Sequence, residues 1–165
     1  MKSIFTAGAL RIHPISESDL QSVFEVYKQC EDFLSLGPVS VASIEMVKED
    51  IEHSKRGNGI FCGISDNNGM IGIIDFIPEI KKYIAFLTLL MIAKPYRYKG
   101  LGLAIMNAFE KYLKTRYNSR SLESGVQINN ILGINFWKKC GFIIDAIENH
   151  LPDRTIAYDM KKEIV

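Results

Sequence analysis

The sequence contains few of the residues that build disulfide frameworks or metal centres. Only three cysteines occur among 165 residues, and none forms a CxxC pair or stands at zinc-ligand spacing from one of the three histidines. An odd number of separated cysteines does not make a complete disulfide framework. We therefore expect Cys30, Cys62 and Cys140 to be buried free thiols, and we expect no bound metal.

Long apolar runs and a strong charge are missing as well. The longest apolar stretch, Ile84 to Ala93, is about half the length that a membrane-spanning helix needs, and the N-terminus lacks the pattern of a signal peptide. The formal net charge of +1 provides no field that would attract nucleic acid. These absences predict a soluble cytoplasmic protein that binds neither membrane nor nucleic acid.

The overall composition is that of one globular domain. Hydrophobic residues make up 47% of the chain and charged residues 24%, and neither a repeat nor a low-complexity segment interrupts it. A chain of this length is long enough to bury a sizeable core. We therefore treat residues 1–165 as one domain.

The most informative stretch is an apolar strand that leads through a short basic loop into an amphipathic helix. The continuous apolar run from Leu87 to Ile92 predicts a strand that is covered on both faces. From Leu101 to Leu113, apolar residues recur at helical spacing. Gly100 and Gly102 stand at the turn between strand and helix.

This order of elements favours anion binding at the loop. A helix N-terminus carries roughly half a positive charge and unpaired backbone N–H groups, and glycines let a ligand approach the backbone without meeting a Cβ atom. Arg97 and Lys99 add positive charge. A dinucleotide fingerprint would need a third glycine where Ile105 stands, and a triphosphate loop would need Gly-Lys-Ser/Thr. Glycines that merely turn the chain remain an alternative.

Two motifs carry a family resemblance. Arg97-Tyr98-Lys99-Gly100-Leu101-Gly102 resembles the Arg/Gln-x-x-Gly-x-Gly/Ala signature of the GNAT acyl-CoA N-acyltransferases. Further along, the segment from Asn130 to Phe142 resembles the second signature of that family, an Asn before a helix that ends in aromatic-x-x-x-Gly-Phe. The motifs follow each other in the family's order and spacing, and the resemblance covers about residues 9–161.

The remaining segments predict an α/β fold with a mixed sheet. Strands expected at 60–65, 70–77 and 83–92 form an antiparallel meander, and a helix at 101–116 leads to a parallel strand at 121–126. A helix at 130–139 and a hairpin of 142–147 with 155–160 close the chain. The resemblance implies that the central strand splays from its parallel neighbour and that helices cover both faces.

The N-terminal third predicts helices behind an edge strand. Residues 10–15 alternate like a short edge strand, with His13 on its solvent face. Ser16 and Asp19 form a capping box before a helix, and Ser40 is expected to cap a second helix from Val41 to about residue 54. The resemblance implies that the apolar loop at 31–40 lines the acceptor pocket; packing onto the core is the alternative.

The resemblance also implies acetyl-CoA as the cosubstrate and indicates where it binds. The pyrophosphate would lie on the backbone amides of about Tyr98 to Leu103, that is Tyr98, Lys99, Gly100, Leu101, Gly102 and Leu103, with Arg97 beside them. The pantetheine arm would pair with the main chain of Leu90, Met91 and Ile92, where unpaired backbone groups can bind it like an added strand. One such N–H, near Leu90 or Met91, could then act as the oxyanion donor, and Asn130 would cap the last helix and touch the arm.

The acid and the base that catalysis needs are less well defined by the sequence. Where many relatives have a Tyr that protonates the leaving thiolate, this chain has Trp137, whose indole cannot do so. Trp137 would wall the thioester end or pack against Phe142. For the acid, Tyr96 is our candidate, with Tyr98, a water or no acid at all as alternatives.

For the base, Asp75 is the first choice over Glu79 and Glu123, because apolar residues flank it in a strand. A position at the rim, with its carboxylate in water, is the alternative.

The expected function is therefore that of an N-acetyltransferase. It would move an acetyl group from acetyl-CoA to a primary amine of a small molecule or peptide by direct attack. A non-catalytic CoA- or acyl-CoA-binding sensor or scaffold is the main alternative, and nucleotide binding at the same loop is a third. The sequence leaves open whether the chain forms a homodimer.

Overall fold

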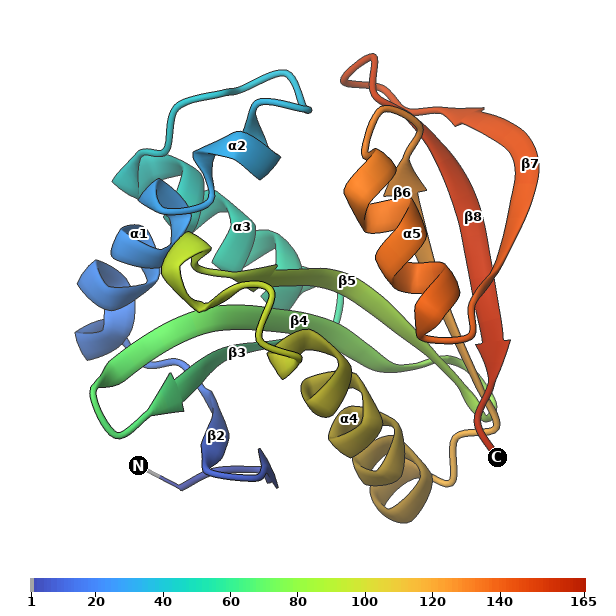
Figure 1. Ribbon diagram of the computed structural model, residues 1–165, viewed down its shortest axis with the longest axis horizontal. Helices are drawn as coiled ribbons and strands as arrows, with labels where there is room; N and C mark the ends of the chain where they lie inside the picture. Colours follow the sequence, from blue (N-terminus) through green and yellow to red (C-terminus); the bar gives the residue numbers. More distant parts are fainter. Residues whose placement is uncertain (1) are drawn as a thin grey trace.

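An eight-stranded sheet in the order β1-β2-β3-β4-β5-β6-β8-β7 runs through the computed structural model, which describes residues 2–165 (Figure 1). The strands are β1 (Phe5–Ala7), β2 (Leu10–Pro14), β3 (Ile60–Asp66), β4 (Gly69–Lys81), β5 (Ile84–Ile92), β6 (Ser121–Gln127), β7 (Ile143–His150) and β8 (Ile156–Glu163). The helices are α1 (Leu20–Lys28), α2 (Glu31–Leu34), α3 (Ile44–Arg56), α4 (Leu101–Tyr117) and α5 (Ile131–Lys139), with short 3-10 turns η1 (Glu17–Asp19) and η2 (Lys94–Tyr96).

The sheet is antiparallel except at one pair of strands. Strands β5 and β6 run parallel, joined by the crossover helix α4, and they pair only where residues 84–87 lie beside residues 121–124. Beyond Leu87 the strands separate, while β5 continues to Ile92 beside β4 alone. The predicted mixed sheet with a splayed central strand is therefore confirmed.

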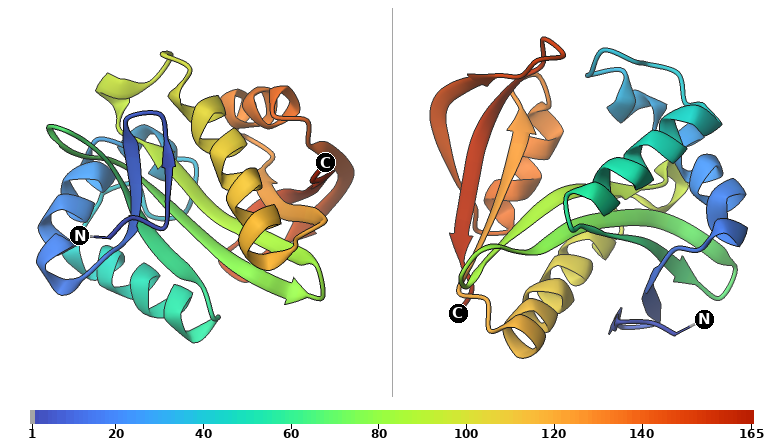
Figure 2. Two further views of the ribbon diagram at one scale, coloured as in Figure 1. Left: turned by 90° about the horizontal axis from the view of Figure 1, so that it is seen from below. Right: turned by 180° about the vertical axis from the view of Figure 1, so that it is seen from behind.

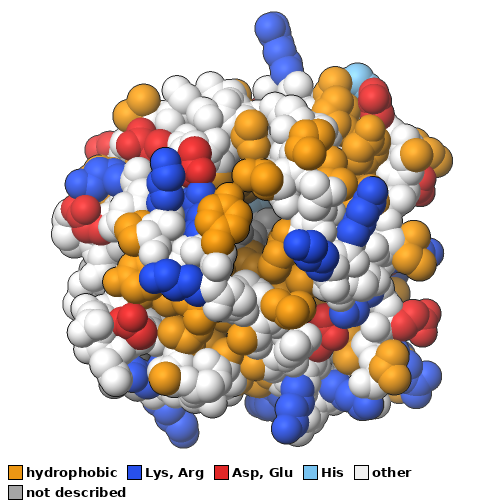
Figure 3. Space-filling model, viewed as in Figure 1, with side chains coloured by type: hydrophobic (Ala, Val, Ile, Leu, Met, Phe, Trp, Pro, Cys, Tyr) orange, Lys and Arg blue, Asp and Glu red, His pale blue; other side chains and the backbone are white. Residues whose placement is uncertain are grey.

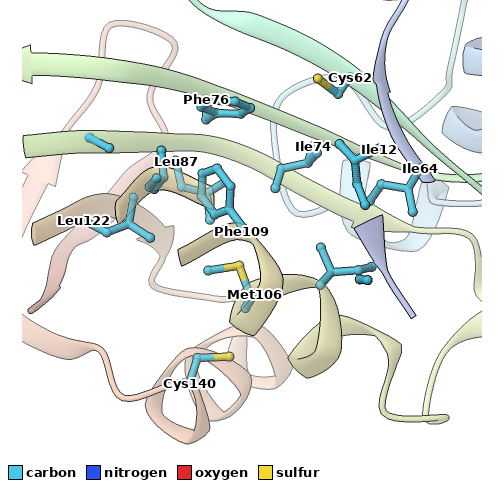
Figure 4. Packing of buried hydrophobic residues seen from close by; sticks show 14 of the residues in the cluster. Ile12, Cys62, Ile64, Ile74, Phe76, Leu87, Met106, Phe109, Leu122 and Cys140 are labelled. Atoms are coloured by element: carbon cyan, nitrogen blue, oxygen red, sulfur yellow. The ribbon is translucent and has the colours of Figure 1, made fainter. Parts of the chain in front are cut away.

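Helices cover both faces of the sheet and enclose two separate cores. Figure 2 shows α4 and α5 on one face and α1 and α3 on the other. The α4 core includes Phe76, Leu87 and Phe109 (Figure 4). The core on the opposite face includes Tyr27 and Met91. Because β5 contributes side chains to both cores, its position is fixed from above and below.

Several local predictions are confirmed at the N-terminal side, and two are wrong in detail. The capping box of Ser16 and Asp19 is present. Ser43, and not Ser40, caps α3: its hydroxyl accepts a hydrogen bond from the N–H of Met46 at 3.1 Å. The segment predicted as a loop also contains the one-turn helix α2. Ser43 itself has an extended backbone, with φ of −140° and ψ of 159°, so the helical conformation begins only at Ile44.

The environment of His13 was predicted wrongly. Strand β2 is not at the edge, because β1 pairs with it on the outside. The His13 side chain is 7% exposed, and its Nε2 lies 2.9 Å from the hydroxyl oxygen of Ser65 on β3. His13 is therefore a buried polar residue of the sheet.

Three further expectations concern thiols, membranes and metals. The cysteines are free and buried, as predicted. No helix within residues 2–165 combines the length and the apolar character that crossing a bilayer requires. In the same range, no cluster of His, Cys, Asp or Glu is arranged to hold a metal ion.

Candidate active site

The open half of β5 presents unpaired backbone groups. The N–H of Ala93 donates to the carbonyl of Ile71 on β4 at 2.8 Å, and antiparallel ladders alternate residue by residue. It follows that Met91 directs its backbone groups toward β4, whereas Leu90 and Ile92 direct theirs away from it. The N–H and C=O of Leu90 and the N–H of Ile92 are unpaired, and the carbonyl of Ile92 accepts a hydrogen bond from the Arg97 side chain. Met91 is also 3% exposed, so its side chain belongs to the core.

A bulge and a hydrogen bond mark the point where β5 and β6 part. Asp75 is opposite Leu89 while Phe76 is opposite Leu87, which leaves Thr88 as an extra, exposed residue. Bulges increase the local twist and bend the strand. The buried hydroxyl of Ser124 on β6 donates to the carbonyl of Leu87 at 2.5 Å. This bond holds β6 against β5 just before the strands separate.

The loop before α4 exposes a run of backbone donors. Within residues 2–165, no oxygen accepts a hydrogen bond from the N–H groups of residues 98–103. Tyr98, with φ of 60°, and Gly100, with φ of 77°, both adopt left-handed conformations. The first turn of α4 contains no acidic residue. Unpaired N–H groups at a helix N-terminus form an anion site, so the geometry fits a pyrophosphate.

The two glycines of the loop have different roles. A Cβ atom on Gly100 would meet nothing within 4 Å, so this position needs glycine for its left-handed φ and for an unobstructed approach. A Cβ atom on Gly102 would lie 3.0 Å from ring carbons of Phe136. Gly102 therefore allows α4 to pack closely against α5, and its contribution to the loop is its backbone N–H.

The charged side chains of the loop do not both point toward its amides. The guanidinium of Arg97 donates to the carboxylate of Asp32 on α2 at 2.5 and 3.1 Å, and its Nε donates to the carbonyl of Ile92 at 2.7 Å. The hydrogen bond from Arg97 lowers the pKa of Asp32. The ammonium of Lys99 lies 5.7 Å from the ring centroid of Tyr96. The positive charge that Arg97 was expected to add beside the loop is therefore paired with the carboxylate of Asp32.

The second motif is organised around a helix cap. The side-chain oxygen of Asn130 accepts a hydrogen bond from the N–H of Gly133 at 2.9 Å, which caps α5 as predicted. Trp137 is 9% exposed and packs edge-on against Phe136 and Phe142, with ring centroids 4.8 and 5.4 Å apart. The indole thus takes the packing role that was one of its two alternatives.

Asp75 is buried, contrary to the alternative of a solvated rim position. It is 4% exposed, and Oδ1 accepts a hydrogen bond from the hydroxyl of Ser54 on α3 at 2.6 Å. Burial raises the pKa of Asp75, and the nearby carboxylate of Asp50 raises it further. Asp75 on β4 lies opposite Leu89, which is the first residue of the open half of β5, so the two backbones are separated by the usual distance between neighbouring strands.

The face that contains these elements is hollowed. Figure 3 shows a depression near the centre of the molecule, bordered by hydrophobic and basic side chains. In the same view, Figure 1 places the loop before α4, the end of β5 and α5 around this position. A basic and apolar border suits a ligand that carries both phosphates and an apolar arm.

Sequence reasoning missed three residues of this arrangement. Thr88, Ser124 and Asp32 belong to no motif, and their roles depend on partners that are distant in the chain. A polar residue within an apolar strand was a visible signal only for Thr88. Hydrogen bonds across the sheet and between α2 and the loop leave no local pattern.

Comparisons with known proteins agree with this geometry. The sequence matches the family described as "Acetyltransferase (GNAT) domain" over residues 12–160. No curated protein matches the sequence as a relative.

Solved structures share the fold at low sequence identity. An acetyltransferase from Thermus thermophilus has a TM-score of 0.77 at 18% identity, with 98% of this chain and 99% of that chain covered. A spermidine N-acetyltransferase from Vibrio cholerae in complex with CoA and spermine has a TM-score of 0.73 at 17% identity, covering 95% and 96%. An acetyltransferase from Salmonella typhimurium that modifies the N-terminal serine of a 50S ribosomal subunit protein has a TM-score of 0.76 at 15% identity, covering 95% and 96%.

The family match spans nearly the whole chain, and the fold, the loop and the splayed strand lie where both motifs predicted them. This chain therefore belongs to the GNAT acetyltransferase family and is an acyl-CoA-dependent N-acyltransferase.

Proposed function

We propose that the protein transfers an acetyl group from acetyl-CoA to a primary amine of a small molecule or peptide by direct attack. The observation that carries this proposal is the run of unpaired N–H groups at residues 98–103 beside the open half of β5. Acetyl-CoA supplies the acetyl group as an activated thioester. The loop would bind the pyrophosphate, and the carbonyl of Leu90 and the N–H of Ile92 would pair with the amide-bearing arm.

The reaction forms a C–N bond and breaks a C–S bond, so the protein must stabilise the carbonyl oxygen and move two protons. The N–H of Leu90 points into the open space next to the bulge at Thr88, which suits a donor to the oxygen where negative charge develops. Holding amine and thioester together contributes about 7–11 kcal/mol to the lowered barrier. Positioning by β5 and the loop is therefore the main catalytic contribution that we assign.

Two carboxylates are candidates for the base. Asp75 has a raised pKa, which brings a carboxylate closer to the working pH, and it would act through a water because its side chain is buried. Glu123 on β6 lies beside Phe86, at the last paired segment before the strands separate, and is half-buried. We therefore propose Asp75 first and Glu123 second. If Asp75 is the base, Asp75→Asn should lose about 10²–10⁴-fold in kcat. If Glu123 is the base, Glu123→Gln should show this loss instead.

We assign the acid role to Tyr96. Trp137 cannot protonate a thiolate, and Tyr96 on η2 is half-buried next to the end of β5. A Tyr96→Phe variant should lower kcat without weakening CoA binding. Equal activity of Tyr96→Phe and the unaltered protein would transfer the role to water.

The acceptor is best identified by measuring thiol release from acetyl-CoA across a panel of amines. The panel should include spermidine and a peptide with a free N-terminal serine, because two similar folds act on such acceptors. Turnover with one amine class would support the proposal. CoA binding without turnover for any amine would favour the sensor, and stronger competition by ATP than by CoA would favour a nucleotide site.

A further inference from the structure

The side chain of Arg97 joins three segments that surround the proposed site. Its two terminal nitrogens donate to both oxygens of Asp32 on α2, and its Nε donates to the carbonyl at the end of β5. Arg97 immediately precedes the loop of residues 98–103. A planar guanidinium that uses its fork on one carboxylate has a fixed orientation. The loop, the end of β5 and α2 are therefore set relative to one another by one residue.

Asp32 belongs to the segment from residue 31 to residue 43, which packs Phe33, Leu34 and Ala42 against the core around Tyr27 and Met91 but makes few hydrogen bonds to distant parts of the chain. The amide of Asn129 donates to the carbonyl of Leu36 at 3.1 Å, and Glu31 accepts from the N–H of Ala42 at 3.2 Å within the segment itself. The Arg97 side chain is 22% exposed and that of Asp32 is 48% exposed. Solvent partly screens the pair, and its two parallel hydrogen bonds are the direct link between this segment and Arg97 at the start of the loop.

We propose that Asp32 is a positioning residue, which, through Arg97, couples binding at the loop of residues 98–103 to the placement of the acceptor-side segment of residues 31–43. This inference rests on the proposed function. A ligand that orders the loop also fixes Arg97, and Arg97 then fixes α2. By linkage, the same coupling makes α2 favour the ligand-bound arrangement of the loop.

The first experiment follows backbone hydrogen exchange with CoA as the probe. In the unaltered full chain, CoA should slow exchange within residues 31–36 by about threefold or more, although CoA would bind to residues 98–103. Asp32→Asn should speed exchange in residues 31–36 without ligand and abolish the response to CoA. Asp32→Glu, which keeps the carboxylate, should restore the response. Glu52→Gln on the exposed side of α3 is the matched control and should behave like the unaltered protein.

The second experiment separates positioning from cofactor binding. With the amine selected by the panel, Asp32→Asn should lower kcat/KM for the amine by about 10-fold, because small misplacements of a reactant are costly. The KM for acetyl-CoA should change by less than about threefold. Asp32→Glu should recover most of the loss.

Two results would overturn the proposal. Tighter CoA binding by Asp32→Asn would mean that Asp32 competes with the pyrophosphate for Arg97. An unchanged exchange pattern at residues 31–36 would mean that the pair does not hold the segment. Failure of the proposed function is separate from both, because it would appear as absent CoA binding in the unaltered protein. The ligand-free effect of Asp32→Asn on exchange would then still test whether the pair holds the segment of residues 31–43.

Discussion

The two halves of β5 have similar sequences and opposite surroundings. Residues 84–87 bond to β4 on one side and to β6 on the other, so their backbone groups are used within the sheet. Residues 89–92 bond to β4 alone. The N–H and C=O groups of Leu90 and the N–H of Ile92 are left free, whereas the carbonyl of Ile92 accepts hydrogen bonds from the Arg97 Nε and the Cys30 thiol. Both halves are apolar. The difference shows that the proposed binding capacity comes from unpaired backbone, and the side chains mainly fix the strand between two cores.

The largest effect is expected from a negative charge placed in the loop of residues 98–103, which follows the open half of β5. Gly100→Asp adds a negative side chain where the pyrophosphate would lie, in a left-handed conformation that costs other residues about 1–2 kcal/mol. The strained backbone and the charge repulsion together should weaken CoA binding, measured by calorimetry, by about 100-fold or more.

Gly8→Asp is a matched control for that variant. Gly8 has φ of 60° and also has no neighbour within 4 Å of an added Cβ atom, but it lies in the β1–β2 turn. Gly8→Asp should keep full CoA affinity and show a similar change in melting temperature. Equal CoA affinities of the two variants would show that the loop of residues 98–103 does not bind CoA.

The next largest effect is expected at the boundary between the two halves of β5. Ser124→Ala removes the hydrogen bond to Leu87 and leaves a buried carbonyl without this partner, so the free energy of unfolding in urea should fall by about 1–3 kcal/mol. Ser119→Ala is the control, because the Ser119 hydroxyl is buried and makes no hydrogen bond to any residue in the range 2–165. Equal losses in both variants would show that the bond does not hold the strands together.

A smaller, pH-dependent effect is expected at Asp75, opposite the open half. Burial holds the pKa of Asp75 above its ordinary value, so the folded chain binds more protons than the unfolded chain. The stability from this group is fully present below the unfolded-state pKa and is lost as pH rises through the folded-state pKa. Asn does not titrate and still accepts the bond from Ser54. The stability of Asp75→Asn relative to the unaltered protein should therefore rise from about pH 4 to about pH 7.

Melting curves across this range measure the difference, and Glu52→Gln, at an exposed site, should show no such trend. A relative stability of Asp75→Asn that falls with pH would contradict the raised pKa and would weaken the case for Asp75 as a base.

The smallest effect is expected at Tyr98, whose side chain is 88% exposed. Tyr98→Gly relieves a left-handed conformation and should raise the free energy of unfolding by about 0.5–1 kcal/mol, with part of the gain offset by the freedom of glycine in the unfolded chain. CoA affinity should stay the same, because the backbone N–H remains. A loss of affinity near 10-fold would show that the phenol ring, and not the backbone, makes the contact.

Much of the site was predictable because its pattern is local. The strand from Leu87 to Ile92, the loop with Gly100 and the cap at Asn130 depend on residues that adjoin in sequence, and the structure has them as predicted. The burial of His13 and of Asp75 was not predictable, because β1 and α3 cover them from distant parts of the chain.

The same reason explains why the sequence did not indicate that the charge of Arg97 is paired. Its partner Asp32 precedes it by 65 positions and lies in a segment without periodicity. Likewise, Met91 and Leu90 are indistinguishable in an apolar run, and only the ladder to β4 decides which of them has free backbone groups.

The most direct measurement is a titration of the isotope-labelled full chain with CoA, followed by the backbone amide resonances. The amide signals of residues 98–103, Leu90 and Ile92 should shift and saturate together, while those of residues 84–87 stay nearly unchanged. A titration that shifts the paired half of β5 and leaves residues 98–103 unmoved would contradict the assignment of CoA to the unpaired backbone.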